Sequence, residues 1–347
     1  MKYDPQLTWR QNLDLAPKAP NEFASAPAVP GSWAFCGLQI DSPLGIPAGP
    51  LLDARWLLYY ANLGFDWLVY KTVRSGEREC YDLPNLVPVE VDAILEAGSV
   101  VAEQQEMQQT WAVSFGMPSQ SPDLWRRDVE FARERLPKNK VLVVSVVGTQ
   151  DPTLTDSAAS LEQLADDFAL CARWAVESGA DAVEANFSCP NVSTADGQLY
   201  QQPAAAGFVA ERIREAIGQK PLVLKIGSVR DNDLGRQLLD QVGSLVDGLA
   251  MTNSIIARVQ KSTGDFLFDG QPRGICGDAI RERSIEQVAM FQRLIIEQGC
   301  ELDLIGVGGI SNRQHVRDYL SAGAAAVGIA TAAMVDPSVG FEIRRDW

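Results

Sequence analysis

Residues 140–148 read KVLVVSVVG, an apolar run without the alternation of polar and apolar residues that marks a half-exposed strand. A strand of this kind is buried on both faces, as in a parallel sheet covered by helices. Seven further short runs rich in Val, Ile, Leu and Ala have the same character, at residues 42–49, 65–72, 180–188, 221–227, 247–254, 302–309 and 324–331.

The segments between these strands are amphipathic. Residues 160–180 and 204–219, for example, carry apolar residues at steps of three and four, which predicts helices. Strands that alternate with helices form a parallel sheet, and eight such units in one chain are what a closed (β/α)8 barrel requires. No linker rich in Pro, Gly and Ser divides the chain. We therefore predict the α/β class and a single TIM-barrel domain over residues 1–347.

Two segments lie outside this repeat. Residues 1–41 are expected to form an N-terminal extension with a short hairpin that closes the floor of the barrel. Residues 73–125, between the second and third strands, are too long for an ordinary loop. We expect them to form an excursion at the rim of the active site.

The charge and the cysteine content argue against several classes of function. The formal net charge of −15 and the pI of about 4.6 disfavour binding to nucleic acid or to anionic membrane surfaces. No apolar stretch resembles a signal peptide or a membrane span, so we expect a soluble cytoplasmic protein. The six cysteines are widely spaced and there is one histidine, which argues against a metal site. Any redox centre would then be an organic cofactor or belong to a partner protein.

In a barrel of this type the carboxyl ends of the strands meet at one mouth, where catalytic groups gather. The last two strands end in GVGGI and GIAT, whose backbone N–H groups can bind a phosphate, although glycine is also common in tight turns. Lys71 and Lys225 end apolar strands, where an ammonium group needs an anion, an electron-rich ring or a salt bridge with an acidic loop residue. The strand ends bring to this mouth Ala48, Gly49, Lys71, Thr72, Asn186, Ser188, Cys189, Asn191, Lys225, Asn253, Ser254, Gly308, Gly309, Ala330 and Thr331.

Cys189 stands between two asparagines in NFSCPN, and its thiol admits three interpretations. It can be an inert buried side chain, a nucleophile or a general base. A nucleophile is disfavoured because the one histidine, His315, falls in a helical stretch after the seventh strand. Proton removal by sulfur is useful only if another agent takes the electrons.

Several of these motifs, in this order, resemble those of the dihydroorotate dehydrogenases and their flavin-dependent relatives, which include dihydropyrimidine dehydrogenase. The resemblance extends over most of the chain, from CGLQIDSPLGIPAGP to VGIATAA. The similar stretches are SPLGIPAG, YKTV, NFSCPN, LVLKIG, MTNSI, RGICGDAI and IGVGGI.

The resemblance implies FMN at the barrel mouth. Lys225 would lie near the N1 side of the flavin, where negative charge develops on reduction. Cys189 would handle the substrate proton, with Lys71 as a second catalytic residue, while the adjacent carbon exchanges hydride with flavin N5. A cysteine rather than a serine at this point is similar to the soluble class of the family. The implied FMN contacts are Ala48, Gly49, Lys71, Thr72, Asn186, Lys225, Ser254, Gly277, Gly308, Gly309, Ala330 and Thr331.

The implied substrate is dihydroorotate, oxidised to orotate at a CH–CH bond next to a carbonyl. A further asparagine is expected at the start of the rim motif, but VSFGMP places Val113 there, unless Ser114 or Ser119 compensates. A different dihydro-heterocycle or an enone therefore stays open as the substrate. The implied substrate contacts are Ser114, Gly116, Met117, Asn186, Asn191 and Asn253.

Two alternatives come from other classes of protein. One is a flavin-free aldolase or isomerase that uses Lys71 or Lys225 as a Schiff-base amine, and the other is a catalytically silent barrel that serves as a binding subunit. The resemblance also implies a homodimer. The electron acceptor stays open between fumarate, NAD through a partner flavoprotein, a quinone and oxygen.

Overall fold

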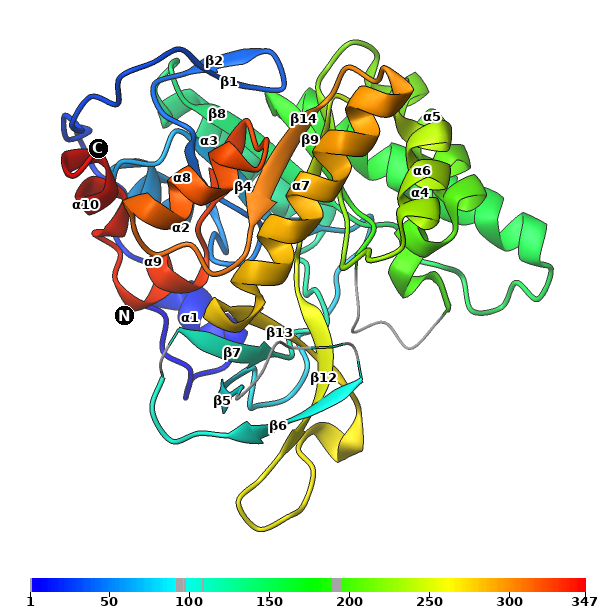
Figure 1. Ribbon diagram of the computed structural model, residues 1–347, viewed down its shortest axis with the longest axis horizontal. Helices are drawn as coiled ribbons and strands as arrows, with labels where there is room; N and C mark the ends of the chain where they lie inside the picture. Colours follow the sequence, from blue (N-terminus) through cyan, green and yellow to red (C-terminus); the bar gives the residue numbers. More distant parts are fainter. Residues whose placement is uncertain (1, 92–95, 97, 108, 189–194) are drawn as a thin grey trace.

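The computed structural model describes residues 2–91, 96, 98–107, 109–188 and 195–347, with the backbone alone at 195–197. Its centre is a closed barrel of eight parallel strands in the order β10-β11-β14-β15-β3-β4-β8-β9 (Figure 1). The predicted (β/α)8 architecture is thereby confirmed. The barrel strands are β3 (Leu44–Ile46), β4 (Trp67–Val73), β8 (Val141–Val146), β9 (Ala182–Asn186), β10 (Leu222–Lys225), β11 (Gly248–Met251), β14 (Asp303–Val307) and β15 (Ala326–Gly328).

Helices surround the barrel. The long ones follow the amphipathic stretches of the sequence, and acidic or amide side chains cap several of them, as Asp156 does by accepting a hydrogen bond from the backbone of Ala159. No helix in the described part of the chain is both long enough and apolar enough to cross a membrane. The helices are α1 (Trp9–Asp14), α2 (Ala54–Ala61), α3 (Pro122–Arg135), α4 (Ser157–Glu177), α5 (Pro203–Ile217), α6 (Asn232–Val242), α7 (Arg281–Gln298), α8 (Arg313–Ser321), α9 (Thr331–Val335) and α10 (Val339–Arg345), with short 3-10 turns at Ala195–Gln201, Phe268–Gly270 and Asp278–Ile280.

Successive residues of a barrel strand point alternately toward the barrel axis and toward the helices. Trp67 and Val143 belong to the apolar cluster inside the barrel, whereas Leu68 and Val144 pack with the surrounding helices. The inner cluster also contains Ala182. The residues that follow these positions at intervals of two along each strand therefore also face the barrel interior.

A second, smaller sheet lies beside the barrel, below it in Figure 1. Its five strands close in the order β12-β13-β7-β5-β6. The predicted excursion at 73–125 supplies three of these strands. The other two come from the chain after β11, where no strands were expected. The strands are β5 (Leu86–Glu90), β6 (Ser99–Glu103), β7 (Thr110–Val113), β12 (Ile255–Gln260) and β13 (Arg273–Gly277).

The N-terminal extension contains a hairpin of β1 (Trp33–Phe35) and β2 (Leu38–Ile40), paired antiparallel. The ring of Phe35 lies 5.0 Å from that of Trp67, at the start of β4. The backbone N–H of Cys36 donates to Asp303 at the start of β14, over 2.8 Å. The hairpin therefore covers the amino-terminal end of the barrel, opposite to the carboxyl ends of the strands.

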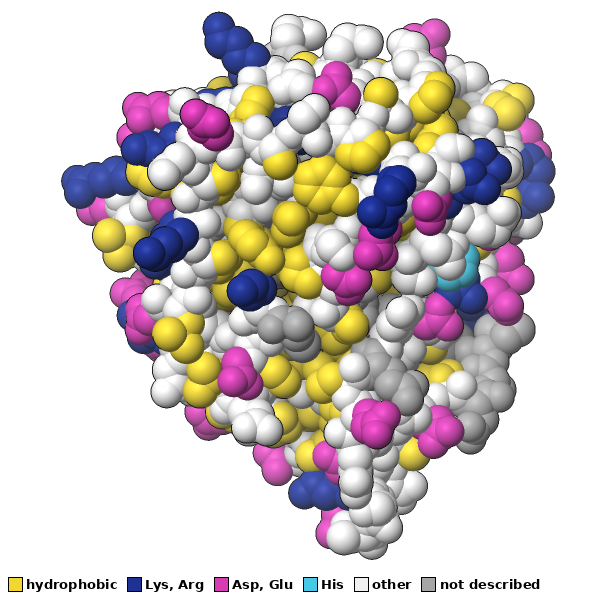
Figure 2. Space-filling view, turned by 90° about the vertical axis from the view of Figure 1, so that its left-hand side faces the viewer, with side chains coloured by type: hydrophobic (Ala, Val, Ile, Leu, Met, Phe, Trp, Pro, Cys, Tyr) yellow, Lys and Arg dark blue, Asp and Glu magenta, His cyan; other side chains and the backbone are white. Residues whose placement is uncertain are grey.

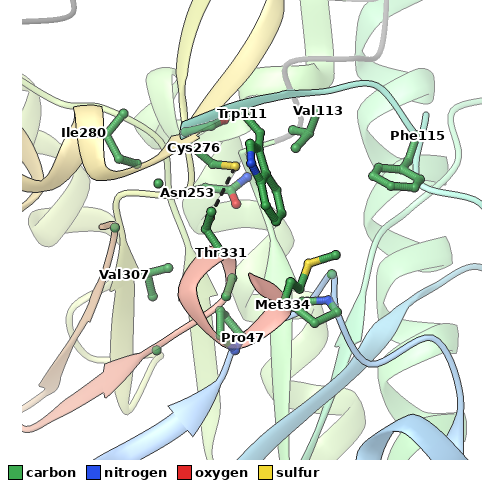
Figure 3. A pocket seen from close by; sticks show the side chains of 18 of the residues that line it. Pro47, Trp111, Val113, Phe115, Asn253, Cys276, Ile280, Val307, Thr331 and Met334 are labelled. Atoms are coloured by element: carbon green, nitrogen blue, oxygen red, sulfur yellow. Dashed lines mark hydrogen bonds between the residues drawn. The ribbon is translucent and has the colours of Figure 1, made fainter. Parts of the chain in front are cut away.

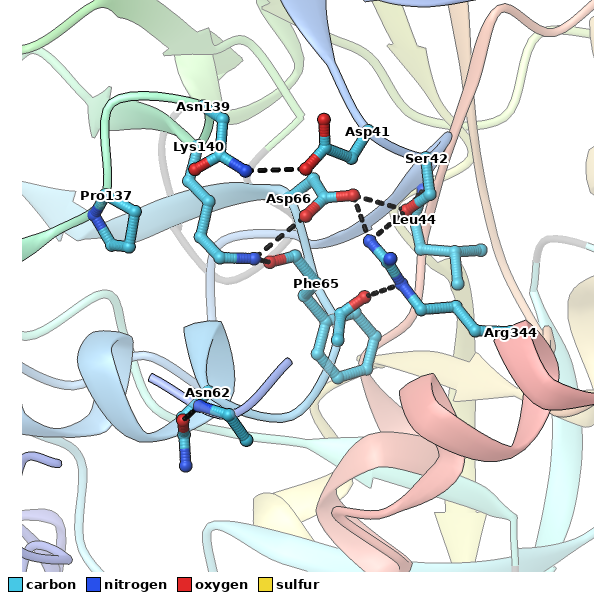
Figure 4. A network of polar contacts seen from close by, with 12 residues as sticks. Asp41, Ser42, Leu44, Asn62, Phe65, Asp66, Pro137, Asn139, Lys140 and Arg344 are labelled. Carbon is cyan, nitrogen blue, oxygen red and sulfur yellow. Dashed lines mark hydrogen bonds and ion pairs between the residues drawn. The ribbon is translucent and has the colours of Figure 1, made fainter. Parts of the chain in front are cut away.

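A buried ionic cluster also lies at the amino-terminal end of the barrel (Figure 4). The carboxylate of Asp66 accepts hydrogen bonds from Lys140 Nζ at 2.8 Å and Ser42 Oγ at 2.6 Å. Arg344 also donates to Asp66, and its Nε donates to the carbonyl of Gly64 at 2.7 Å. Because Arg344 belongs to α10, the cluster ties the last helix to the starts of the barrel strands.

One face of the surface is shown in Figure 2. Basic and acidic side chains are interspersed over it, and hydrophobic side chains gather in a hollow near its centre. Among the described side chains of this face, the basic ones form no continuous area that could bind a phosphate backbone or an anionic lipid surface.

Candidate active site

A cavity lies at the carboxyl ends of the barrel strands, and β7 and β13 of the second sheet form its opposite wall (Figure 3). Most of the residues that the sequence pointed to line this one cavity, although they come from distant parts of the chain. They are Ala48, Gly49, Lys71, Thr72, Gly116, Met117, Asn186, Ser188, Lys225, Asn253, Ser254, Gly277, Gly308, Gly309, Ala330 and Thr331.

Among the described residues, one expected site residue does not line the cavity. Ser114 is buried elsewhere, and its hydroxyl accepts a hydrogen bond of 2.8 Å from Nε of Arg273. This hydrogen bond links the end of β7 to the start of β13. Cys189 and Asn191 lie outside the described residues.

The two lysines of the site are both buried. Lys225 is 2% exposed at the end of β10, and its Nζ lies 4.0 Å from Oε1 of Glu184 on β9. An acidic partner for Lys225 was one of the expectations, but the partner is a strand residue inside the barrel rather than a loop residue. Lys71 is 8% exposed in β4 and also lines the cavity.

Two amide side chains are oriented by the short segment after β9. Oδ1 of Asn186 accepts from the backbone N–H of Ser188 at 3.2 Å, and Nδ2 of Asn253 donates to the carbonyl of Ser188 at 3.1 Å. Nδ2 of Asn186 also lies 3.5 Å from Sδ of Met117. An asparagine amide offers two N–H donors and a carbonyl acceptor, so both side chains keep capacity for a ligand.

Glycines form another side of the cavity. Gly49 has φ +139°, and no atom lies within 4 Å of the position that a Cβ would take there. Gly308 and Gly309 have φ of +147° and +65°, and a Cβ on Gly309 would come within 2.7 Å of Arg281. The backbone can adopt these turns only without side chains, which leaves N–H groups available beside the start of α9.

The wall formed by β7 is apolar. Trp111, Val113 and Phe115 occur at every second position and all line the cavity, whereas Ala112 between them packs in the core of the second sheet. Figure 3 shows these three side chains facing the region of Pro47, Asn253 and Met334. The sequence predicted Val113 at this rim, but it did not predict Trp111 or Phe115. The alternation in WAVSF (111–115) was the signal that could have found them.

Cys276 is a further lining residue that the sequence did not single out. Its Sγ lies 3.7 Å from the hydroxyl of Thr331, which donates to it. Burial raises the pKa of this thiol to about 11, and the Thr331 hydrogen bond and the charge of Lys225 only partly offset that rise. Cys276 is therefore a protonated thiol at neutral pH.

Arg74 holds the rim segment in place. Its Nε donates to the carbonyl of Met117 at 3.3 Å, and one terminal nitrogen donates to Gly148 O at 3.2 Å and to Thr149 Oγ1 at 2.9 Å. The side chain is buried, and it links the segment around Met117 to the loop after β8. Within the described ranges, no cluster of three or more His, Cys, Asp or Glu could hold a metal ion.

Comparison with known proteins places this arrangement in a family. The family model of dihydroorotate dehydrogenase matches residues 32–346. A dihydroorotate dehydrogenase of Dictyostelium discoideum is 30% identical over 98% of this chain and 95% of that protein. The catalytic subunit of a dihydroorotate dehydrogenase B (NAD(+)) of Fusobacterium nucleatum is 32% identical, over 46% of this chain and half of its own length.

A solved structure shows the same fold. The dihydroorotate dehydrogenase of Eimeria tenella, crystallised in complex with ferulenol, superposes with a TM-score of 0.70 at 18% identity, over 91% of this chain and 82% of that one. The family match over nearly the whole chain and the Dictyostelium relative agree with it. This chain therefore belongs to the dihydroorotate dehydrogenase family of flavoprotein oxidoreductases.

Proposed function

We propose that this protein is an FMN-dependent dehydrogenase that oxidises a CH–CH bond next to a carbonyl, with dihydroorotate as the leading substrate. The observation that carries the proposal is the meeting of two buried lysines, two oriented asparagines and the glycine turns in one cavity. Because the family consists of oxidoreductases, the Schiff-base aldolase and the silent binding subunit are set aside.

The residues present fit FMN. The open space beside Gly49 admits a planar ring, Lys225 supplies a cation, and the turn at Gly308 and Gly309 beside α9 presents N–H groups that suit a phosphate. FMN, when bound, supplies a two-electron acceptor for hydride from a substrate carbon. We propose as its contacts the twelve residues that the family resemblance implies for FMN, from Ala48 to Thr331, all of which line the cavity.

The chain itself orients the substrate and moves a proton. Asn186 and Asn253 can hydrogen-bond the carbonyl and N–H groups of a dihydropyrimidine ring, and Lys71 can pair with developing negative charge. The apolar wall of Trp111 and Phe115 excludes water from the same space. The role of Cys189 as the general base rests on the sequence resemblance, because that residue lies outside the described part of the chain.

Cofactor binding tests the proposal. Apoprotein freed of flavin by chaotropic salt should bind one FMN per chain, with quenching of FMN fluorescence. It should bind riboflavin more weakly, because riboflavin lacks the phosphate group. Gly309→Val is the variant with an impaired phosphate site, since its side chain would clash with Arg281 and with the neighbouring turn. Apoprotein that binds neither flavin would overturn the proposal.

One observation favours a second candidate substrate. Val113 lines the cavity between Trp111 and Phe115, so its side chain offers the substrate no hydrogen-bonding group at this position. A ring with an apolar edge, in another dihydro-heterocycle or an enone, would suit the wall better than one with polar groups all round. Mixing the FMN-loaded enzyme with a panel of such compounds distinguishes the two candidates by which of them exchanges electrons with the flavin.

The assembly and the domain organisation are also proposals. Residues 1–347 are proposed to act as one FMN-binding domain, with 1–41 as an extension and 73–125 at the rim. We propose a homodimer by resemblance to the family, which light scattering of the FMN-loaded protein tests. The electron acceptor is to be found by mixing the reduced enzyme with fumarate, a quinone, oxygen or NAD with a partner flavoprotein.

A further inference from the structure

Glu184 is a buried carboxylate that the proposed reaction does not use. It lies in β9, two residues after Ala182, which belongs to the apolar cluster inside the barrel. Alternation along the strand therefore turns Glu184 toward the barrel interior, one step below Asn186. Glu184 is 3% exposed, and it does not itself line the cavity.

The surroundings of Glu184 leave it dependent on one cation. Its Oε1 has no hydrogen-bond partner among the described residues, and within the same part of the chain its ion pair is with Lys225, at 4.0 Å. Both side chains are almost completely buried. A carboxylate is costly in such a place unless a nearby positive charge compensates it, so its presence calls for a role.

The position of the pair suggests that role. Lys225 lines the cavity and Glu184 lies behind it, so the carboxylate meets the ammonium group from the side away from the ligand. The opposite charges cancel in part, and the field that reaches the cavity is weaker than that of a lone lysine. A cation beside a flavin stabilises the negative charge gained on reduction, and a partly neutralised cation does so less.

We propose that Glu184 is a positioning residue that, through Lys225, lowers the reduction potential of the bound flavin. This inference rests on the proposed function. The couple concerned takes up two electrons and one proton to give the anionic reduced flavin. The carboxylate holds the ammonium group in place and limits how strongly it favours that product.

The test is the reduction potential of FMN-loaded Glu184→Gln, measured at pH 7 against a reference dye. The amide keeps the size of the side chain but removes its charge. We expect the ratio of reduced to oxidised flavin at a fixed potential to rise about tenfold, which is a shift of about +30 mV for a two-electron couple. Glu184→Asp keeps the charge and should stay within about threefold of the wild type. Lys225→Gln should shift the ratio in the opposite direction.

The outcomes separate this inference from the function on which it rests. If wild-type protein does not bind FMN, the flavin assignment itself is wrong. If wild type and Glu184→Gln both bind FMN with unchanged or lowered potential in the variant, the role of Glu184 is overturned while the flavin assignment stands. A rise of equal size in Glu184→Asp would also overturn it, since the effect would then come from packing and not from charge.

Discussion

Nδ2 of Asn186 lies 3.5 Å from Sδ of Met117, which joins a barrel strand to the rim segment across the mouth of the cavity. Met117 has φ +52°, a left-handed conformation that is uncommon outside glycine, and Arg74 donates to its carbonyl. Met117, on the substrate side of the site, is therefore held in place by contacts with Asn186 of the barrel and with Arg74.

Arg74→Lys should weaken substrate binding without loss of the cofactor. Arg74 reaches Met117 through Nε and Gly148 and Thr149 through a terminal nitrogen, and lysine has only one nitrogen to serve these separated acceptors. We expect KM for the substrate to rise about tenfold, with little change in FMN content, as measured by steady-state kinetics and flavin absorbance. Arg236→Lys, at an exposed ion pair, is the matched control. An unchanged KM in Arg74→Lys would show that the rim segment does not contribute to substrate binding.

Val113→Asn should strengthen the binding of orotate. Val113 faces the cavity, and an asparagine there would add a donor and an acceptor on the apolar wall. One additional hydrogen bond contributes about 1 kcal/mol, so the Kd of orotate should fall about fivefold in a titration followed by flavin absorbance. Val113→Ala, which adds no polar group, should not show this gain. Weaker binding by the asparagine variant would mean that orotate presents no polar edge to β7.

Cys189→Ala should slow reduction of the flavin by substrate by about 10²-fold or more, as the loss of a general base does. The FMN content should not change, because the proposed role of Cys189 concerns the substrate proton. Stopped-flow absorbance under anaerobic conditions measures this rate directly. Equal rates in the wild type and in Cys189→Ala would mean that a group other than Cys189 removes the substrate proton.

Arg344→Met should destabilise the fold. It leaves the buried carboxylate of Asp66 without one of its two cations at the amino-terminal end of the barrel. Breaking a buried ion pair from one side typically costs about 3–5 kcal/mol of the free energy of unfolding, which urea denaturation measures. Arg236→Met, at the surface, should cost less than about 1 kcal/mol. A similar loss of the free energy of unfolding in both variants would show that the buried cluster contributes no more to stability than a surface ion pair does.

The barrel could be predicted from the sequence because its signal is local. Runs such as 140–148 are almost entirely apolar, and most of them are followed by an amphipathic helix. The order of the strand-end motifs also located about half of the residues that line the cavity, since parallel strands bring their carboxyl ends together.

The second sheet could not be predicted in the same way. Its β7 pairs with β13, so that Trp111 lies opposite Cys276, more than a hundred residues away in the chain. Short strands whose partners are so distant leave no local signal that identifies the pairing. For the same reason the contact of Lys225 with Glu184 and the contact of Arg74 with Met117 could not be predicted. In the sequence, Glu184 appears only as one residue of an apolar strand.

The proposed function requires that this cavity bring FMN together with dihydroorotate for its oxidation. Anaerobic addition of dihydroorotate to the FMN-loaded enzyme tests it most directly. We expect loss of the oxidised-flavin absorbance, with one orotate formed for each FMN reduced. An enzyme that binds FMN but whose absorbance stays unchanged with excess dihydroorotate would contradict it.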